Sequence, residues 1–173
     1  MQYKPEQAIE VLSRTPQVLE ALLSGLSDDW LYSNEGPGTW SPVEVVGHLI
    51  INEETNFLPR TKLILSDGGS KTLSPIDMTA HIERFDEVPV GELLQSFREL
   101  RNENIRSLQS INPTATDLSK TAIHPKVGLV QLSHVLSTWV AHDLIHIGQI
   151  SRVMAKQYRH EVGPFIEFLP RLK

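Results

Sequence analysis

The sequence predicts an all-α protein, a four-helix bundle with a long crossover between its second and third helices. Apolar residues recur at helical spacing along four long stretches, and no convincing strand pattern lies between them. A long segment without periodicity, residues 67–89, separates the second stretch from the third. Amphipathic helices bury their apolar faces against one another, and a chain of 173 residues suits one domain. We therefore expect a single helical-bundle domain over residues 1–173.

Residues 5–26 are expected to form the first helix. Leucine, isoleucine and valine recur there every three or four positions, as on one face of a helix. Pro16 lacks a backbone N–H and restricts the conformation of Thr15 before it. The pattern therefore predicts a kink or a break at the Thr15-Pro16 step.

The second helix has the clearest start signal. Ser41 is a suitable N-cap, Pro42 suits the first helical position, and Glu44 completes a capping box. The apolar pattern continues to about Leu65. Pro59 lies inside this helix and should bend it.

The long segment 67–89 is expected to be a connection without regular elements, which crosses the length of the bundle. The third helix is predicted over residues 90–111, ended by Asn112 and the proline after it. The fourth is predicted over residues 128–158, before the break at Gly163. A crossover of this kind allows the second and third helices to lie parallel.

Composition and charge exclude several classes of protein. Hydrophobic residues make up 40% of the chain and charged residues 21%, as in ordinary globular proteins. The net charge is −5 and there is no Lys/Arg run, which argues against nucleic acid or an anionic membrane as partner. The first residues are too polar for a signal peptide, and no apolar run approaches the roughly 18 residues of a membrane span. We therefore expect a soluble, cytoplasmic protein.

The histidines are the main functional signal. His142 and His146 lie one turn apart on the apolar face of the fourth helix, and His48 lies on the second helix with Asn52 on its face. Since the chain has no cysteine, a metal site would need histidines, carboxylates or amides. Three histidines leave a coordination position open, as in catalytic sites. The alternative is that these imidazoles are only hydrogen-bonded in the core.

Other polar residues are weaker candidates. Asn52 is expected to be a pocket wall or to support a metal ligand, and Gln149 continues the histidine face. Asp143 completes an H-D-x-x-H segment, but aspartate is shorter than the glutamate of zinc proteases, so we place it at the edge of the site. No third protease ligand follows at a persuasive spacing on a helix, although Glu167 is tolerably placed in sequence, and His134 could approach the pocket. The remaining histidines are expected to be solvated: His81, His124 and His160.

Two segments, TWSPVEVVGHL and the distant WVAHDLIHIGQISRV, resemble the DinB-like superfamily, particularly its DinB_2 group. The resemblance covers most of the chain and implies a four-helix bundle with His48, His142 and His146 as the ligands of Zn²⁺ or Ni²⁺. Glu53 matches a position that is often polar in the family, and no role is assigned to it. The better-understood relatives are transferases and isomerases that use low-molecular-weight thiols such as bacillithiol, mycothiol or glutathione.

The leading hypothesis from the sequence is therefore a metal-dependent enzyme acting on a small molecule. Transfer of a thiol ranks ahead of hydrolysis because the resemblance implies thiol-dependent relatives, whereas the residues themselves allow either reaction, since a bound ion lowers the pKa of a thiol as it does that of water. The thiol would come from solution, since the chain has no cysteine. A metal-binding, stress-associated protein without turnover is the alternative from another class. A homodimer is also expected, partly from the resemblance and partly because symmetric dimers are the commonest oligomers.

Overall fold

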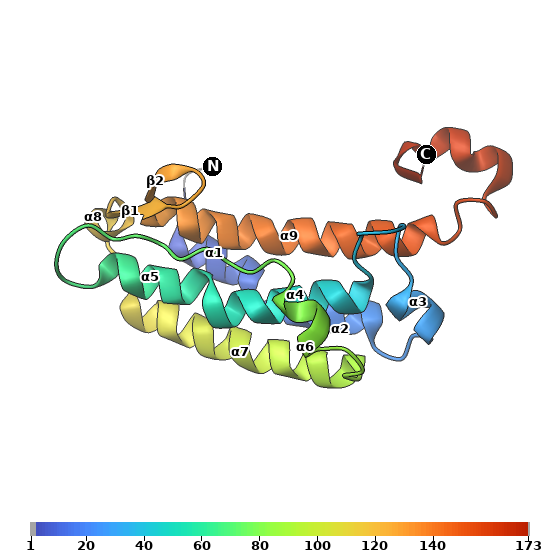
Figure 1. Cartoon of the computed structure of the whole chain (residues 1–173), viewed down its shortest axis with the longest axis horizontal. Helices are drawn as coiled ribbons and strands as arrows, with labels where there is room; N and C mark the ends of the chain where they lie inside the picture. The colour runs from blue at the N-terminus through green and yellow to red at the C-terminus, as the bar shows by residue number, and fades with distance from the viewer. Residues whose placement is uncertain (1–2, 173) are drawn as a thin grey trace.

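The computed structural model describes residues 3–172, which form a bundle of four helical segments with short elements at its ends and in the crossover (Figure 1). Two segments are broken into two helices each: α1 (Pro5–Leu12) with α2 (Thr15–Leu23), and α4 (Pro42–Thr55) with α5 (Phe57–Leu65). The other two are the continuous helices α7 (Val90–Ile111) and α9 (Leu132–Lys156). The predicted four-helix bundle is confirmed. Within the described residues, no helix is both long enough and apolar enough to cross a membrane.

The direction of the segments follows from the crossover. The segment α4–α5 and helix α7 run the same way along the bundle, whereas α1–α2 and α9 run the opposite way (Figure 1). Residues 66–89 carry the chain back along the bundle between the end of α5 and the start of α7. The second and third segments are therefore parallel, as a long crossover permits.

Proline positions explain the two breaks. The first segment is interrupted between Leu12 and Thr15, as predicted from Pro16. The second is interrupted at Asn56, whose φ of −105° and ψ of −90° are not helical. Pro59, three residues later, explains this break. A proline cannot donate a hydrogen bond to the carbonyl four residues earlier, and its ring crowds the preceding turn.

Two expectations about the connections are wrong. The crossover contains a short helix, α6 (Ala80–Arg84), and the fourth helix is preceded by an antiparallel hairpin of β1 (Thr121–His124) and β2 (Gly128–Gln131). Helix α9 consequently begins at Leu132 and not near residue 128. Four-residue strands are too short to show a clear alternation, so the sequence pattern did not reveal them. The remaining short elements are α3 (Asp28–Tyr32), α8 (Ala115–Leu118), η1 (Gly163–Phe168) and η2 (Pro170–Leu172).

The apolar core consists of two clusters, one toward each end of the bundle. The first core cluster includes Leu19, Leu49, Phe97 and Ile150, and the second includes Leu12, Phe57, Ile105 and Trp139. Each of the four segments contributes to both clusters. Between them, near the middle of the bundle, the inward-facing side chains are polar, and this is where the candidate site lies.

Candidate metal centre

Helix α4 places His48 inside the bundle. The predicted capping box is present: Ser41 Oγ accepts a hydrogen bond from the Glu44 N–H, and Glu44 Oε2 accepts one from the Ser41 N–H. About two turns later the chain reaches His48, which is 1% exposed. Asn52 lies one turn further on the same face and donates to the His48 carbonyl oxygen over 2.8 Å.

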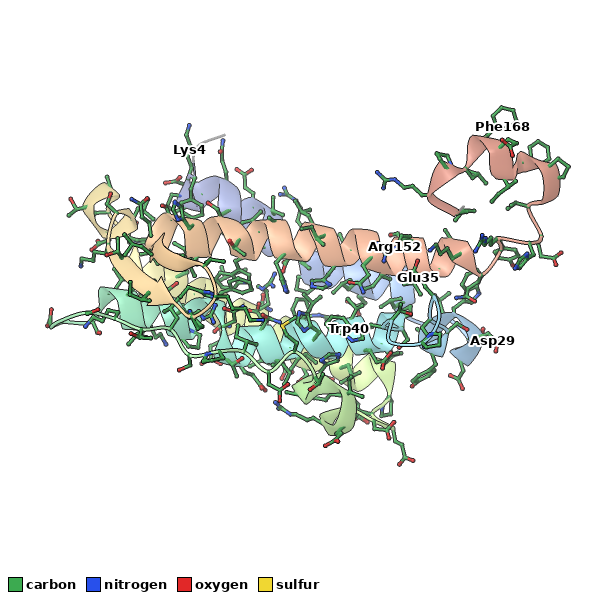
Figure 2. The ribbon with its side chains drawn as sticks, turned by 45° about the horizontal axis from the view of Figure 1, so that its top comes forward. Lys4, Asp29, Glu35, Trp40, Arg152 and Phe168 are labelled. Atoms are coloured by element: carbon green, nitrogen blue, oxygen red, sulfur yellow. The ribbon has the colours of Figure 1, made fainter. Side chains whose placement is uncertain are left out.

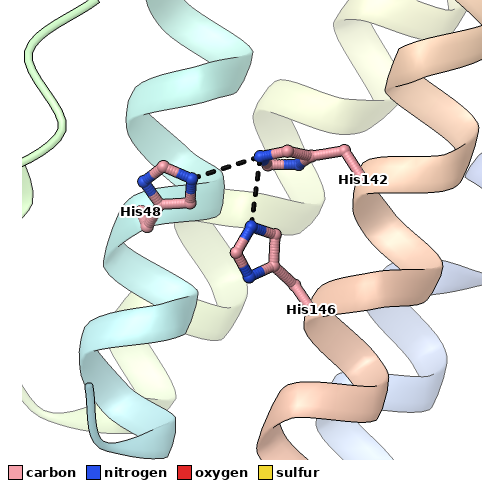
Figure 3. Close-up of side chains that lie close together, drawn as sticks. All are labelled: His48, His142 and His146. Carbon is pink, nitrogen blue, oxygen red and sulfur yellow. Dashed lines mark hydrogen bonds between the residues drawn. The ribbon is translucent and has the colours of Figure 1, made fainter. Parts of the chain in front are cut away.

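Helix α9 supplies the other two imidazoles. His142 is half-buried and His146 is buried, and both point toward α4 (Figure 3). His142 Nε2 lies 3.2 Å from His48 Nε2 and 3.1 Å from His146 Nε2. One ring nitrogen of each residue lies within 4.8 Å of the other two. Tetrahedral ligands at 2.0–2.1 Å from zinc are about 3.3 Å apart, so two of the three separations already match a metal site.

The surroundings keep these imidazoles neutral. Burial is the main cause that lowers the pKa of His48 and of His142 to about 3, and the neighbouring histidines contribute to the same shift. Burial also lowers the pKa of His146, although its hydrogen bond to Gln149 acts in the opposite direction. Metal ligation requires an unprotonated nitrogen. The protonation state that the fold favours is therefore the one that binds a metal.

The hydrogen-bonding capacity of the cluster also fits a cation. A neutral imidazole carries one N–H and one lone pair. The Nδ1 atoms of His48 and His142 are buried, and neither has a hydrogen-bond partner among residues 3–172. With the protons on Nδ1 in all three rings, three Nε2 lone pairs are directed at one another, and a shared cation resolves this repulsion. Three imidazole nitrogens are a donor set that Zn²⁺ and Ni²⁺ accept.

Two of the predicted pocket residues lie against the cluster. Gln149 Oε1 is 2.8 Å from His146 Nδ1 and accepts a hydrogen bond from its N–H, which leaves His146 Nε2 free for a metal. Asn52 Nδ2 is 3.0 Å from His48 Nε2, and Asn52 Oδ1 accepts from Asn56 over 2.7 Å. When the lone pair of His48 Nε2 coordinates an ion, Asn52 keeps its second hydrogen bond, to the His48 carbonyl oxygen.

We expect Gln149→Leu to weaken Zn²⁺ binding by about 10–100-fold, the usual effect of losing a hydrogen bond that orients a ligand. The leucine cannot accept the His146 Nδ1–H, so the ring loses its fixed tautomer and orientation. Competition with a chromophoric chelator measures the affinity, and Ser151→Ala, an exposed change on the same helix, is the control. An unchanged affinity in Gln149→Leu would show that the glutamine does not orient the ligand.

Aromatic side chains line the histidine cluster, and their place there was not predicted from the sequence. The Trp40 ring lies 4.7 Å from that of His48, and the Phe57 ring lies 5.3 Å from that of His142 (centroid distances). The loop that carries Trp40 is held to α9 by Arg152, whose Nη2 donates to Glu35 Oε2 over 2.7 Å (Figure 2). These walls are apolar and limit the access of water to the imidazoles.

The expectation that His81 is solvated is wrong. This residue is 1% exposed, and its ring lies 5.4 Å from that of His48 and 4.6 Å from that of Trp40. Helix α6 approaches α4 so closely at Gly47 that a Cβ there would come within 2.9 Å of Phe85. Because the crossover has no periodicity, the sequence carried no signal that α6 covers the site.

The two acidic candidates are both buried and both pair with one arginine. Asp143, expected at the edge of the site, directly follows His142, is fully buried and pairs with Arg101. Glu53, to which no role was assigned, pairs with the same arginine. Arg101 itself was missed, although its position four residues after the buried Phe97 places a charge on the apolar face of α7.

The remaining candidates lie outside the cluster. His134 is exposed in the first turn of α9, where its Nδ1 accepts from the Gln131 N–H. His124 Nδ1 accepts from a backbone N–H within the hairpin, and His160 is exposed beyond the end of α9. Glu167 is exposed in η1, in the C-terminal segment. His134 therefore does not approach the pocket.

Comparison with known proteins agrees with this architecture. Among solved structures, the chain is similar to YfiT from Bacillus subtilis, described as "a probable metal-dependent hydrolase with an unusual four-helix bundle topology". The TM-score is 0.77 at 23% identity, over 90% of this chain and 94% of that one, so the likeness shows a common fold. None of the curated proteins compared with the chain matches it. The family model of the DinB superfamily matches residues 12–150, and the chain belongs to this superfamily.

Proposed function

We propose that the chain is a metal-dependent hydrolase in which His48, His142 and His146 hold one divalent ion, Zn²⁺ or Ni²⁺. The observation that carries the proposal is the convergence of three neutral Nε2 atoms with separations of 3.1 and 3.2 Å about His142. Three protein ligands are typical of catalytic zinc, whereas structural zinc has four. The description of YfiT as a probable hydrolase supports the choice of reaction.

The residues around the cluster suit this chemistry. A bound divalent ion would lower the pKa of a coordinated water and polarise a substrate carbonyl. His142 is half-buried, so a small molecule can approach the cluster from its side. Trp40 and Phe57 provide apolar walls, and the Asn52 amide is a hydrogen-bond donor at the edge of the cluster. Gln149 holds His146 in the required tautomer.

Thiol transfer is the second candidate. The observation that favours it is the absence of cysteine from all 173 residues, because a thiol substrate at the metal would then meet no competing thiol from the chain. The same open position would lower the pKa of a small thiol and supply a thiolate at neutral pH. The site geometry is compatible with either nucleophile.

The test is a comparison of metal-loaded protein, without a histidine tag, on two substrate panels. Chromogenic esters, amides and thioesters report hydrolysis, and monochlorobimane with glutathione or bacillithiol reports thiol transfer. The expected result is hydrolysis that requires metal, is abolished by a chelator and is absent in His142→Ala. Metal-dependent turnover only in the presence of thiol would replace hydrolysis by transfer. If the protein binds metal stoichiometrically but turns over no substrate of either panel, it is a metal-binding protein and the enzyme proposal is overturned.

The apoprotein should lose stability as the pH falls below 6.5. The pKa of His48 and of His142 is about 3 in the folded protein and 6.5 as the ordinary value, so the unfolded chain binds more protons between these limits. The free energy of unfolding therefore decreases by up to about 1.4 kcal/mol per pH unit for each histidine as the pH falls through this window. Above pH 6.5 the contribution is fully present. Chemical denaturation between pH 4 and pH 8 measures the slope.

Added metal should stabilise the folded protein across most of this pH window. A ligand that binds only the folded state stabilises it by about 2.7 kcal/mol at a concentration one hundred times its Kd. Zn²⁺ or Ni²⁺ should therefore raise the melting temperature at pH 7.5 and also near pH 5.5, and the effect should be lost only as the pH approaches the folded-state pKa of about 3 of His48 and His142, where protons compete for the nitrogens. If metal-free protein shows no rise at pH 7.5, the histidines form a hydrogen-bonded core and not a metal site.

A further inference from the structure

A layer of buried polar side chains crosses the bundle between the two core clusters. Each of the four helical segments contributes to this polar layer, which consists of Thr15, Glu53, Arg101, Asn104 and Asp143. The layer lies beside the metal centre along the chain as well as in space. Asp143 directly follows His142 on α9, and Glu53 directly follows Asn52 on α4.

The guanidinium of Arg101 is the centre of the polar layer. Its Nη2 donates to Glu53 Oε1 over 2.7 Å and to Asp143 Oδ1 over 3.0 Å, so one nitrogen links α4 to α9. Its Nη1 donates to Asp143 Oδ2 and to the Leu12 carbonyl oxygen at the end of α1. Thr15, at the start of α2, donates to Asp143 Oδ2 over 2.6 Å. All four segments are therefore connected through a single side chain.

Stability alone does not account for the polar layer. Removing an arginine and two carboxylates from water is costly, and well-packed apolar residues in place of a buried ion pair are often neutral or stabilising. Arg101 is 0% exposed, and the core clusters on either side offer apolar neighbours that would suit a leucine or methionine there. What the ionic layer provides, and an apolar layer would not, is directional contact at fixed distances.

We propose that Arg101 is a positioning residue for the metal ligands, an inference that rests on the proposed metal site. The guanidinium forms ion pairs with Asp143, which directly follows His142, and with Glu53, which lies five residues after His48. These two carboxylates lie on α9 and α4, the helices that carry all three imidazoles. The spacing of α4 and α9 is thereby set at the level of the metal centre. Small changes in that spacing would move His48 Nε2 relative to His142 Nε2, and ligand geometry tolerates only a few tenths of an ångström.

The charge of the polar layer also acts on the metal centre. Two carboxylates and one guanidinium leave a formal charge of −1, which is buried beside the imidazoles. A cation bound by the histidines would be acted on by this net charge: Asp143 favours positive charge at His146, whereas Arg101 opposes it at His142. Arg101 therefore acts on the site by orienting the ligand-bearing helices and not by attracting the ion.

The test separates positioning from folding. In the triple variant Arg101→Met, Glu53→Gln, Asp143→Asn the charges are removed, while the amide oxygens still accept from Trp139 Nε1 and Thr15 Oγ1. We expect a folded protein whose Zn²⁺ affinity is weaker by about 10–100-fold, as for other groups that act on metal ligands through their neighbours. The visible spectrum of the Co²⁺-loaded protein should also change, because it reports ligand geometry. Arg101→Lys, which keeps one charge but loses the double contact, should be intermediate.

The matched control is Arg98→Met with Glu20→Gln, which removes an exposed ion pair one turn earlier on α7. This variant should bind Zn²⁺ and Co²⁺ like the parent protein. If the triple variant and Arg101→Lys are folded and bind both metals like the parent, the positioning role is overturned. If the parent itself binds neither metal, the proposed function fails instead, so the two failures are distinguishable.

Discussion

Replacing His142 with alanine is expected to lower Zn²⁺ affinity by more than about 100-fold, beyond the usual effect of losing a supporting hydrogen bond. His142 Nε2 is the central atom of the cluster, 3.2 Å from His48 and 3.1 Å from His146. The two remaining nitrogens cannot complete a three-ligand site. The bundle should remain folded, because the two apolar core clusters do not depend on a metal, unlike the core of a zinc finger.

Chelator competition and circular dichroism together measure this outcome. His160→Ala, an exposed histidine beyond the end of α9, is the control and should change neither property. Retention of parental affinity in His142→Ala would exclude the proposed ligand set. Loss of the whole fold in His142→Ala would instead show that the ion is structural, which would count against an enzyme.

Replacing Arg101 with methionine is expected to destabilise the protein by about 3–5 kcal/mol, the usual cost of removing one partner from a buried ionic network. The carboxylates of Glu53 and Asp143 would lose their shared cation while buried at 3% and 0% exposure. For a chain of this length, such a loss lowers the melting temperature by roughly 6–20 °C. Arg98→Met, on the same helix but in an exposed ion pair, should cost no more than about 1 kcal/mol.

Denaturant titration of both arginine variants compares these costs directly. The triple neutral variant should recover much of the stability that Arg101→Met alone loses, since it leaves no unpaired buried charge. Equal stability of Arg101→Met and the parent would mean that water or a proton satisfies the carboxylates at little cost. The contacts within the polar layer would then contribute less to the free energy of unfolding than their geometry indicates.

Local signals explain why the helices could be predicted. The capping box at Ser41, the break at Pro16 and the stop at Asn112 each depend on a few neighbouring residues, and the structure contains all three. The hairpin before α9 and the short helix α6 are different. They are too short for periodicity to reveal, and their formation depends on contacts with distant segments, such as the bridge between Thr72 and Ile123.

The convergence of the histidines could be foreseen for the same reason. The four-residue spacing of His142 and His146 places them on one helical face, and the apolar residues beside them show that this face is buried. The second helix of the bundle has His48 on its own buried face. Trp40 and His81 could not be foreseen, because a loop residue and a crossover residue have no face that the sequence defines.

The sequence by itself determined the four main helical segments, the long crossover, the buried face of each segment and the three imidazoles that meet. These depend on the helical repeat and on local caps, which act over a few residues. Only the tertiary structure decided the partners of Asp143 and Glu53 and the central place of Arg101. Which buried charge meets which is set by the relative rotation and height of helices that are far apart in the chain. That arrangement results from packing between helices, which the periodicity within any one helix does not specify.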